Sequence, residues 1–250
     1  MFTRLRLTLN GYRRAFTLRH KTKNVKHRNW RFAFLHIGKN AGSTIGDFLL
    51  TLSRHGHRTP VVLGHDWTVQ DVARRYPGMK ISFVIRDPLD RIISGFNSRL
   101  RQGRPRNQNL WQPDEAIAFA HFHRIEDFFA ACMSDDEYQQ SAARFARHHV
   151  QHVRDGYVHH FGSVEALRQN RHRIHCVGTV DGLDGFLTRL LAPVGVDYPS
   201  VRSLLADQHR AAIRSAALLE RFSDAEMTRL RSFFADEYAI YEELKSMVGS

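Results

Sequence analysis

The feature that most constrains the fold is a short apolar stretch that runs directly into a glycine-containing loop and then into an amphipathic segment. Residues 32–37 (FAFLHI) form a dense apolar run, which is typical of a buried β-strand. The loop at residues 38–44 (GKNAGST) follows without a break. Beyond the loop, apolar side chains recur at helical spacing, at Ile45, Phe48, Leu49 and Leu52. The sequence therefore predicts a strand, a glycine loop and a helix in immediate succession.

Two further apolar runs repeat this order. The run at residues 61–63 precedes a helix-like stretch at residues 68–76. The run at residues 81–85 precedes another at residues 88–100, where Asp87 suits the N-cap position and the proline after it suits the first helical turn. Strands that alternate with helices indicate an α/β fold around a central parallel sheet, with ligands bound at the carboxyl ends of the strands.

The rest of the chain is mostly helical in pattern, with one more strand expected at residues 173–178. We expect helices over residues 114–131, 135–154, 183–191, 202–222 and 224–247. Its length and composition suit one sizeable core. We therefore predict a single domain over residues 30–250, with a helical C-terminal part, preceded by a basic N-terminal arm over residues 1–29.

The charge distribution points to a polyanionic partner. The formal net charge is +12, and no Asp or Glu occurs before Asp47. Charge alone leaves a nucleotide, an acidic glycan, nucleic acid and an anionic membrane face as alternatives. In the arm, four apolar side chains fall near helical spacing, at Leu5, Leu9, Tyr12 and Phe16. The arm is then either an amphipathic helix on an anionic surface or a solvated extension.

Cysteine usage and hydropathy bear on location. Cys132 and Cys176 form neither a disulfide framework nor a metal-binding spacing, so we expect two buried thiols in a reducing compartment. No stretch approaches the roughly 20 apolar residues of a membrane span, and the N-terminus lacks the apolar core of a signal peptide. We expect a cytoplasmic protein, with peripheral membrane contact through the arm as an open alternative.

The loop at residues 38–44 has the chemistry of a phosphate site. A glycine loop between a strand and a helix offers backbone N–H groups at the positive end of the helix dipole. Lys39, Ser43 and Thr44 add side-chain donors. The loop is not a Walker A motif, because that motif places its lysine after the second glycine and Lys39 precedes Gly42. An ordinary ATP or GTP site is therefore disfavoured.

Two blocks carry a resemblance to a known family. Residues 36–44 (HIGKNAGST) resemble the H-I-P-K-T-G-G-T-S loop of sulfotransferases that use 3′-phosphoadenosine 5′-phosphosulfate (PAPS), in the carbohydrate branch that includes heparan sulfate 2-O-sulfotransferase-like enzymes. Residues 86–94 (RDPLDRIIS) resemble the block that binds the 3′-phosphate, R-D-P-x-x-R-x-x-S. The main departures from the first motif are Gly38, Asn40 and Ala41 in place of Pro, Thr and Gly, while Ser43 and Thr44 exchange the order of its two hydroxyl residues.

Other segments resemble the family more weakly. The 2-O branch places a catalytic histidine in a G-H element between the two blocks, where this chain has Gly64 and His65. Residues 149–156 resemble the N-P-Q-x-x-x-x-G segment, of which only Gln151 and its closing glycine carry over. Residues 177–183 resemble V-G-x-x-E-x-L, with aspartate in place of glutamate.

The resemblance implies a P-loop-like three-layer fold, PAPS as sulfate donor, the bisphosphate PAP as product and no metal. It implies that Lys39 stabilises the leaving group and that His65 is the base, while Asp66 either orients the imidazole or is itself the base. The implied donor contacts are Gly38, Lys39, Asn40, Ala41, Gly42, Ser43, Thr44, Arg86 and Ser94. Asp66, Arg91 and Gln151 are implied near the substrate, and Arg91 is alternatively a structural ion-pair partner.

The acceptor expected from the basic charge and the branch resembled is an anionic glycan or glycolipid. The alternatives are a metal-dependent nucleotide kinase or other phosphate-binding α/β protein, and a basic nucleic-acid-binding module. The nucleic-acid-binding module leaves both blocks unexplained, so we expect no nucleic-acid partner. Histidine pairs 148/152 and 172/175 leave a zinc site as a further alternative, without a carboxylate or cysteine at supporting spacing.

Overall fold

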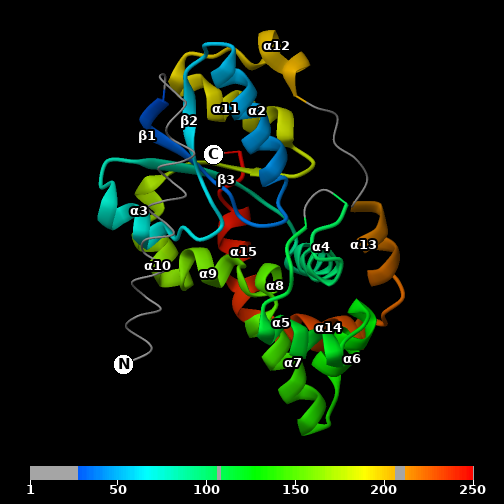
Figure 1. The fold of residues 1–250 in the computed structure, drawn as a ribbon. Helices are drawn as coiled ribbons and strands as arrows, with labels where there is room; N and C mark the ends of the chain where they lie inside the picture. The colour runs from blue at the N-terminus through cyan, green and yellow to red at the C-terminus, as the bar shows by residue number, and fades with distance from the viewer. Residues whose placement is uncertain (1–27, 106–107, 206–211, 250) are drawn as a thin grey trace, which may run out of the picture.

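A computed structural model of the chain describes residues 28–105, 108–205 and 212–249 (Figure 1). Its centre is a four-stranded parallel sheet in the order β2-β1-β3-β4. The strands are β1 (Arg28–Leu35), β2 (Thr59–Leu63), β3 (Lys80–Ile85) and β4 (Ile174–Thr179). The α/β class and the parallel sheet are as predicted. Nearly all of the predicted N-terminal arm, including its amphipathic segment, lies outside the described residues, and the division into arm and single domain stays a prediction.

Helices cover both faces of the sheet, because alternate strand residues point to opposite sides. On one face, Phe34 of β1 packs with α2 (Gly42–Arg54), α11 (Leu183–Leu191) and α12 (Tyr198–Val201). These three helices lie together in Figure 1. The other face packs against four helices: α3 (Val69–Arg75), α9 (Tyr157–Phe161), α10 (Val164–Gln169) and α15 (Ala235–Lys245). This is the three-layer arrangement that the resemblance implied.

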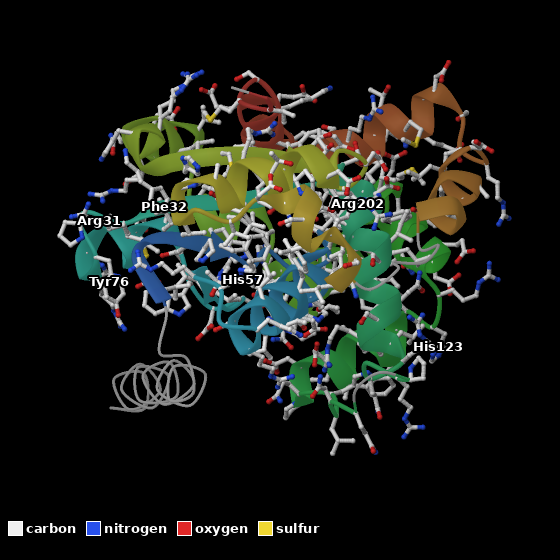
Figure 2. All side chains as sticks on the ribbon, turned by 90° about the horizontal axis from the view of Figure 1, so that it is seen from above. Arg31, Phe32, His57, Tyr76, His123 and Arg202 are labelled. Atoms are coloured by element: carbon white, nitrogen blue, oxygen red, sulfur yellow. The ribbon has the colours of Figure 1, made fainter. Side chains whose placement is uncertain are left out.

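A second apolar cluster lies among helices beside the sheet and is rich in aromatic side chains. The Phe96 ring lies 5.3 Å from that of Phe119 and 5.5 Å from that of Phe128, measured between centroids. The helices of this part are α4 (Pro88–Leu100), α5 (Pro113–His121), α6 (Ile125–Met133), α7 (Glu137–His149), α8 (Gln151–Arg154), α13 (Ala212–Leu219) and α14 (Asp224–Phe233). Seen from above, His123 of this part lies at the opposite end of the molecule from Arg31 and Tyr76 (Figure 2).

Local signals placed several elements correctly. The helix α4 spans the predicted residues, and the Asp87 carboxylate accepts hydrogen bonds from the backbone N–H groups of Leu89 and Asp90. The helix α11 also has its predicted bounds. Cys132 and Cys176 are both buried free thiols, as expected. Within the described residues, no helix is both long and apolar enough to cross a membrane.

Three predicted long helices are wrong, because each is broken at a buried apolar residue. Phe122 separates α5 from α6, Val150 separates α7 from α8, and Phe234 separates α14 from α15. The helices on both sides of the first two breaks contribute to the same aromatic-rich cluster. The break at Phe234 instead lets α14 pack in that cluster while α15 packs mainly against the sheet, and periodicity alone reveals neither arrangement. The predicted helix over residues 202–222 is also shorter, since Arg202–Leu204 is a 3-10 turn and α13 begins at Ala212.

Candidate functional site

The predicted glycine loop joins β1 to α2 in a strained conformation. Lys39 and Ala41 adopt positive φ angles of 69° and 57°, which cost an ordinary residue about 1–2 kcal/mol each. Gly42 is required by its surroundings, because a Cβ there would lie 1.8 Å from Cδ2 of His36. Strain of this kind concentrates at functional sites. The exposed Ser43 and the buried Thr44 follow in the first turn of α2.

The N-terminus of α2 is built to receive a negative charge. Ala41 is its N-cap residue and supplies no capping side chain, and the first turn holds no acidic residue. Asp87, Asp136 and Ser223 cap α4, α7 and α14 with side-chain oxygens, and the uncapped helices α6, α11 and α15 each hold an acidic residue in the first turn. Backbone N–H groups left uncapped at the positive end of a 13-residue helix suit an anion.

Asn40 anchors this loop from within. It is 1% exposed, and its Nδ2 donates to the carbonyl oxygen of Val84 at 3.0 Å and to the hydroxyl of Tyr157 at 3.2 Å. The side chain thus fastens the loop to β3. Any contact between Asn40 and a sulfate donor would come from its backbone.

Lys39 lies among other cations. Burial lowers the pKa of its ammonium group, and the nearby Arg101 and Arg86 lower it further. An anion placed among these three groups would offset their mutual repulsion. Arg101 directly follows α4 and belongs to neither motif, so sequence reasoning missed it.

Arg86 immediately follows β3, with its side chain about 10% exposed. Its Nη2 donates to Oγ of Ser215 in α13 at 3.1 Å, and its Nε lies 3.7 Å from the Asp90 carboxylate. Ser94 lies further along α4 and is half-buried. Ser215 is a further residue that no sequence motif indicated.

Arg91, for which the sequence left a substrate contact and a structural ion pair as alternatives, lies in the interior of the protein. Its side chain is fully buried, and it donates to the carbonyl oxygens of His152 and Val153 at 2.8 and 3.1 Å. The Glu237 carboxylate lies 3.5 Å from its Nη2. Arg91 therefore holds α8 against α4, and a contact between Arg91 and a substrate stays a prediction.

His65 follows β2, so it stands at the same sheet edge as Lys39 and Arg86. Its Nδ1 lies 3.0 Å from the carbonyl oxygen of His36. That nitrogen must be the hydrogen-bond donor, which leaves Nε2 as the basic nitrogen of the neutral ring. The His36 carbonyl oxygen thus orients the ring through Nδ1, and Asp66 is half-buried next to His65, so the role of Asp66 stays a prediction.

His152 is a second imidazole at this site, and sequence reasoning assigned it no part in transfer. Its ring centroid lies 5.5 Å from that of His65, and a Cβ at Gly38 would lie 3.5 Å from its Nδ1. Burial, helped by His65 and Lys39, lowers its pKa to about 3. The neutral ring therefore stands beside the cationic groups. Gly95 lets α8 approach this closely, because a Cβ there would lie 2.7 Å from the His152 carbonyl oxygen.

Gln151 and the two histidine pairs are the remaining candidates from the sequence. The backbone N–H of Gln151 donates to Glu115 Oε1 at 3.0 Å, and its side chain is half-buried. Glu115 itself is buried in an ion pair with Arg99. Within the described residues, no three His, Cys, Asp or Glu side chains are grouped so as to hold a metal ion, and the histidine pairs therefore gain no support as a zinc site.

The neutral buried imidazoles predict acid sensitivity. The pKa of His160, which is fully buried, also lies well below its usual value because of burial. Unfolded histidines titrate near 6.5, so below that pH the unfolded state binds more protons and the free energy of unfolding falls. Between pH 7.5 and 5.5 we expect a loss of roughly 2–3 kcal/mol, measured by urea unfolding. His152→Gln should remove about half of this dependence, and equal stability at both pH values would contradict the assignment.

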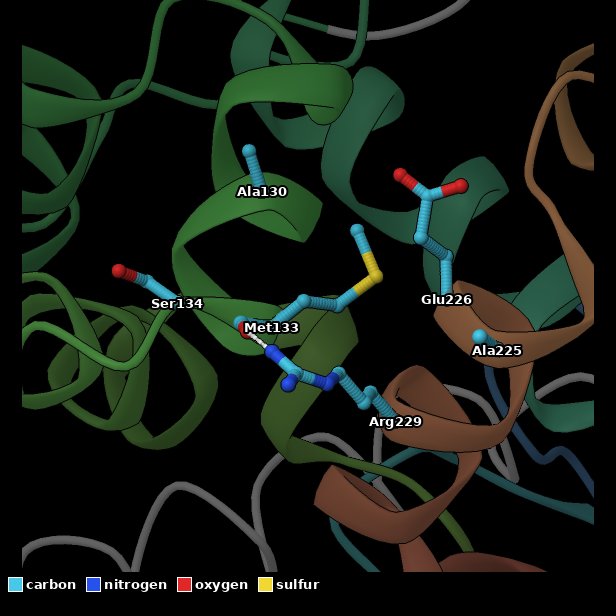
Figure 3. A pocket seen from close by; sticks show the side chains of 6 residues that line it. All are labelled: Ala130, Met133, Ser134, Ala225, Glu226 and Arg229. Atoms are coloured by element: carbon cyan, nitrogen blue, oxygen red, sulfur yellow. Dashed lines mark hydrogen bonds between the residues drawn. The ribbon is translucent and has the colours of Figure 1, made fainter.

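A hollow lies apart from these residues, between α6 and α14 (Figure 3). It is lined by Ala130, Met133, Ser134, Ala225, Glu226 and Arg229. The Arg229 guanidinium crosses it to donate to the Met133 carbonyl oxygen at 3.1 Å. None of its lining residues belongs to the site predicted from the sequence.

Comparison with known families agrees with the geometry at the sheet edge. Residues 22–242 match a family model described as the sulfotransferase family. No curated protein and no solved structure matches the chain. The matched segment contains the loop after β1, His65, Arg86 and the whole of α4.

Proposed function

The chain belongs to the sulfotransferase family, and from this premise we propose that it transfers the sulfuryl group of PAPS to a hydroxyl of an acceptor. Family membership establishes sulfuryl transfer in general. The observation that carries the proposal is the uncapped N-terminus of α2, next to a lysine that is desolvated between Arg86 and Arg101. A strongly anionic donor would supply the negative charge that this arrangement lacks.

The two phosphate ends of PAPS fit two separate parts of the sheet edge. The loop at residues 38–44 would receive the 5′-phosphosulfate through backbone N–H groups, Lys39, Ser43 and Thr44. Arg86 and Ser94 would receive the 3′-phosphate. Both parts follow neighbouring parallel strands, whose carboxyl ends lie at one edge.

We expect an in-line displacement at sulfur. The acceptor oxygen forms a bond to sulfur as the bond from sulfur to the bridging oxygen of the donor breaks, and PAP leaves. Nε2 of His65 takes the proton of the acceptor hydroxyl, while Lys39 stabilises the charge that develops on the bridging oxygen. We expect no metal requirement, because the sulfuryl group carries less charge than a phosphoryl group and these donors suffice.

An anionic glycan or glycolipid is the acceptor that best suits the positive charge of the protein. The proposal rests on the net charge of +12 and on the cations around Lys39. We further propose a cytoplasmic location, with the basic arm as the contact to an anionic membrane. Incubation with radiolabelled PAPS and a panel of glycans, lipids and peptides identifies the acceptor, and labelling of peptides alone would contradict this choice.

Donor binding is testable before the acceptor is known. Adenosine 3′,5′-bisphosphate with a chelator should raise the melting temperature, since a ligand at 100 times its Kd stabilises a protein by about 2.7 kcal/mol. Arg86→Ala should abolish most of the shift, whereas the control Arg202→Ala should keep it, because Arg202 pairs with Asp184 on the exposed surface. A shift with ATP and magnesium or with duplex DNA, and none with the bisphosphate, would favour the kinase or nucleic-acid alternative.

A further inference from the structure

A buried tyrosine joins the two parts of the site that would bind the donor. Tyr157, at the start of α9, is 0% exposed. Its hydroxyl accepts hydrogen bonds from Asn40 Nδ2 at 3.2 Å and from the backbone N–H of Arg86 at 2.9 Å, and it donates to the Arg86 carbonyl oxygen at 2.5 Å. One donor and two acceptor positions are all that a hydroxyl has, so this hydroxyl is saturated.

We propose that Tyr157 is a positioning residue, which sets the distance between the phosphate loop and the Arg86 backbone and so allows both ends of the donor to bind together. The inference rests on the proposed function, because it assigns the two ends to these two parts. Asn40 connects the loop to the hydroxyl, and Arg86 connects β3 to it. A single oxygen atom thus contacts both halves of the site.

Tyr157 is itself held rigidly. Its backbone N–H donates to Glu237 Oε2 at 2.8 Å, and the N–H of Val158 donates to Oε1 at 3.1 Å. Gly156 is required, because a Cβ there would lie 2.4 Å from Nη2 of Arg91 and from Oε2 of Glu237. The ring stacks on Tyr241 with centroids 5.9 Å apart. Side chains from α4 and α15 therefore hold the start of α9 and the Tyr157 ring in place.

The tyrosine also accounts for a departure from the family motif. Asn40 stands where the resembled loop has threonine. Its longer amide reaches both Val84 and the hydroxyl, so it holds a loop in which Lys39 and Ala41 are strained. Burial raises the pKa of Tyr157, which keeps the hydroxyl protonated and able to donate to Arg86. Without the hydroxyl, Asn40 would keep only its bond to Val84.

The test compares a ligand with two phosphates and a ligand with one. Tyr157→Phe keeps the ring and removes the hydroxyl, and Tyr241→Phe is the matched control. Titration calorimetry with Tyr157→Phe should show affinity for adenosine 3′,5′-bisphosphate reduced about tenfold or more, equal to about 1.4 kcal/mol. Affinity for adenosine 5′-monophosphate should change less than about threefold, equal to about 0.7 kcal/mol. Tyr241→Phe should leave both affinities unchanged.

Other outcomes separate this inference from the proposed function. Equal losses for both ligands, or no loss for either, would make Tyr157 a structural residue and overturn the inference. Failure of the wild-type protein to bind the bisphosphate would overturn the donor proposal itself. Asn40→Ala tests the same contact from the loop side and serves if Tyr157→Phe does not fold. In the double variant, the total loss of affinity for the bisphosphate should be smaller than the sum of the two single losses, because both changes break one hydrogen-bond chain.

Discussion

Replacing His65 by alanine should lower the rate of sulfuryl transfer by about 10²–10⁴-fold, which is the usual contribution of a positioned general base. Affinity for adenosine 3′,5′-bisphosphate should stay nearly unchanged, because the imidazole is assigned to the acceptor hydroxyl and not to the donor. The rate is measured with radiolabelled PAPS and the acceptor that labels best, and the affinity by titration calorimetry.

His65 also supports the loop, so a second variant separates the two roles. Its Nδ1 bonds to the carbonyl oxygen of His36, and alanine would remove that bond as well. His65→Asn retains a donor at the Nδ1 position but offers no basic nitrogen. It should be about as inactive as His65→Ala, while the exposed control His172→Ala should keep full activity. Loss of bisphosphate binding in His65→Asn would remove His65 from the base role.

Lys39→Ala should behave differently from the His65 variants. Removing a preorganised donor to a developing negative charge typically costs about 10²–10³-fold in turnover. Because Lys39 also lies in the loop assigned to the 5′-phosphosulfate, affinity for the donor should fall too. A Lys39 variant with normal turnover would contradict its assignment to the leaving oxygen.

The sequence predicted those parts of the fold whose signals are local. The order of strand, loop and helix, the N-cap at Asp87 and the bounds of α4 and α11 depend on neighbouring residues, and all are present. The common sheet edge of Lys39, His65 and Arg86 follows from parallel pairing of adjacent strands. The sequence did not predict the direction in which each side chain of the loop points. Asn40 points inward, toward Val84 and Tyr157.

Residues that join the site from distant segments could not be predicted in this way. His152 and Tyr157 are more than 100 residues from the phosphate loop. His152 lies in the segment that retains little of its family motif, and Tyr157 directly follows that segment. They reach the site because buried contacts around Arg91 and Gly95 hold α8 against α4. Such contacts leave no periodic pattern, and the same holds for the helix break at Val150 that precedes them.

Removal of the buried carboxylate of Glu237 should strongly destabilise the protein. It is 4% exposed, it accepts from two backbone N–H groups, and it faces the buried guanidinium of Arg91. Glu237→Ala would remove the carboxylate that pairs with the Arg91 guanidinium and accepts from both backbone N–H groups. We therefore expect the free energy of unfolding to fall by about 3–5 kcal/mol. Urea unfolding measures this loss. It is carried out near pH 7.5, above the pH range in which the histidines titrate.

Two comparisons show whether the loss comes from the buried charge. Glu243→Ala breaks the surface ion pair with Arg168, whose side chain is 63% exposed, and should cost less than about 1 kcal/mol. In the Arg91→Met background, Glu237→Ala should cost clearly less than it does alone, because no buried cation then remains unpaired. If Glu237→Ala cost no more than Glu243→Ala, the carboxylate would not hold the turn at Gly156, and the rigid support inferred for Tyr157 would have to come from the stacking of its ring on Tyr241.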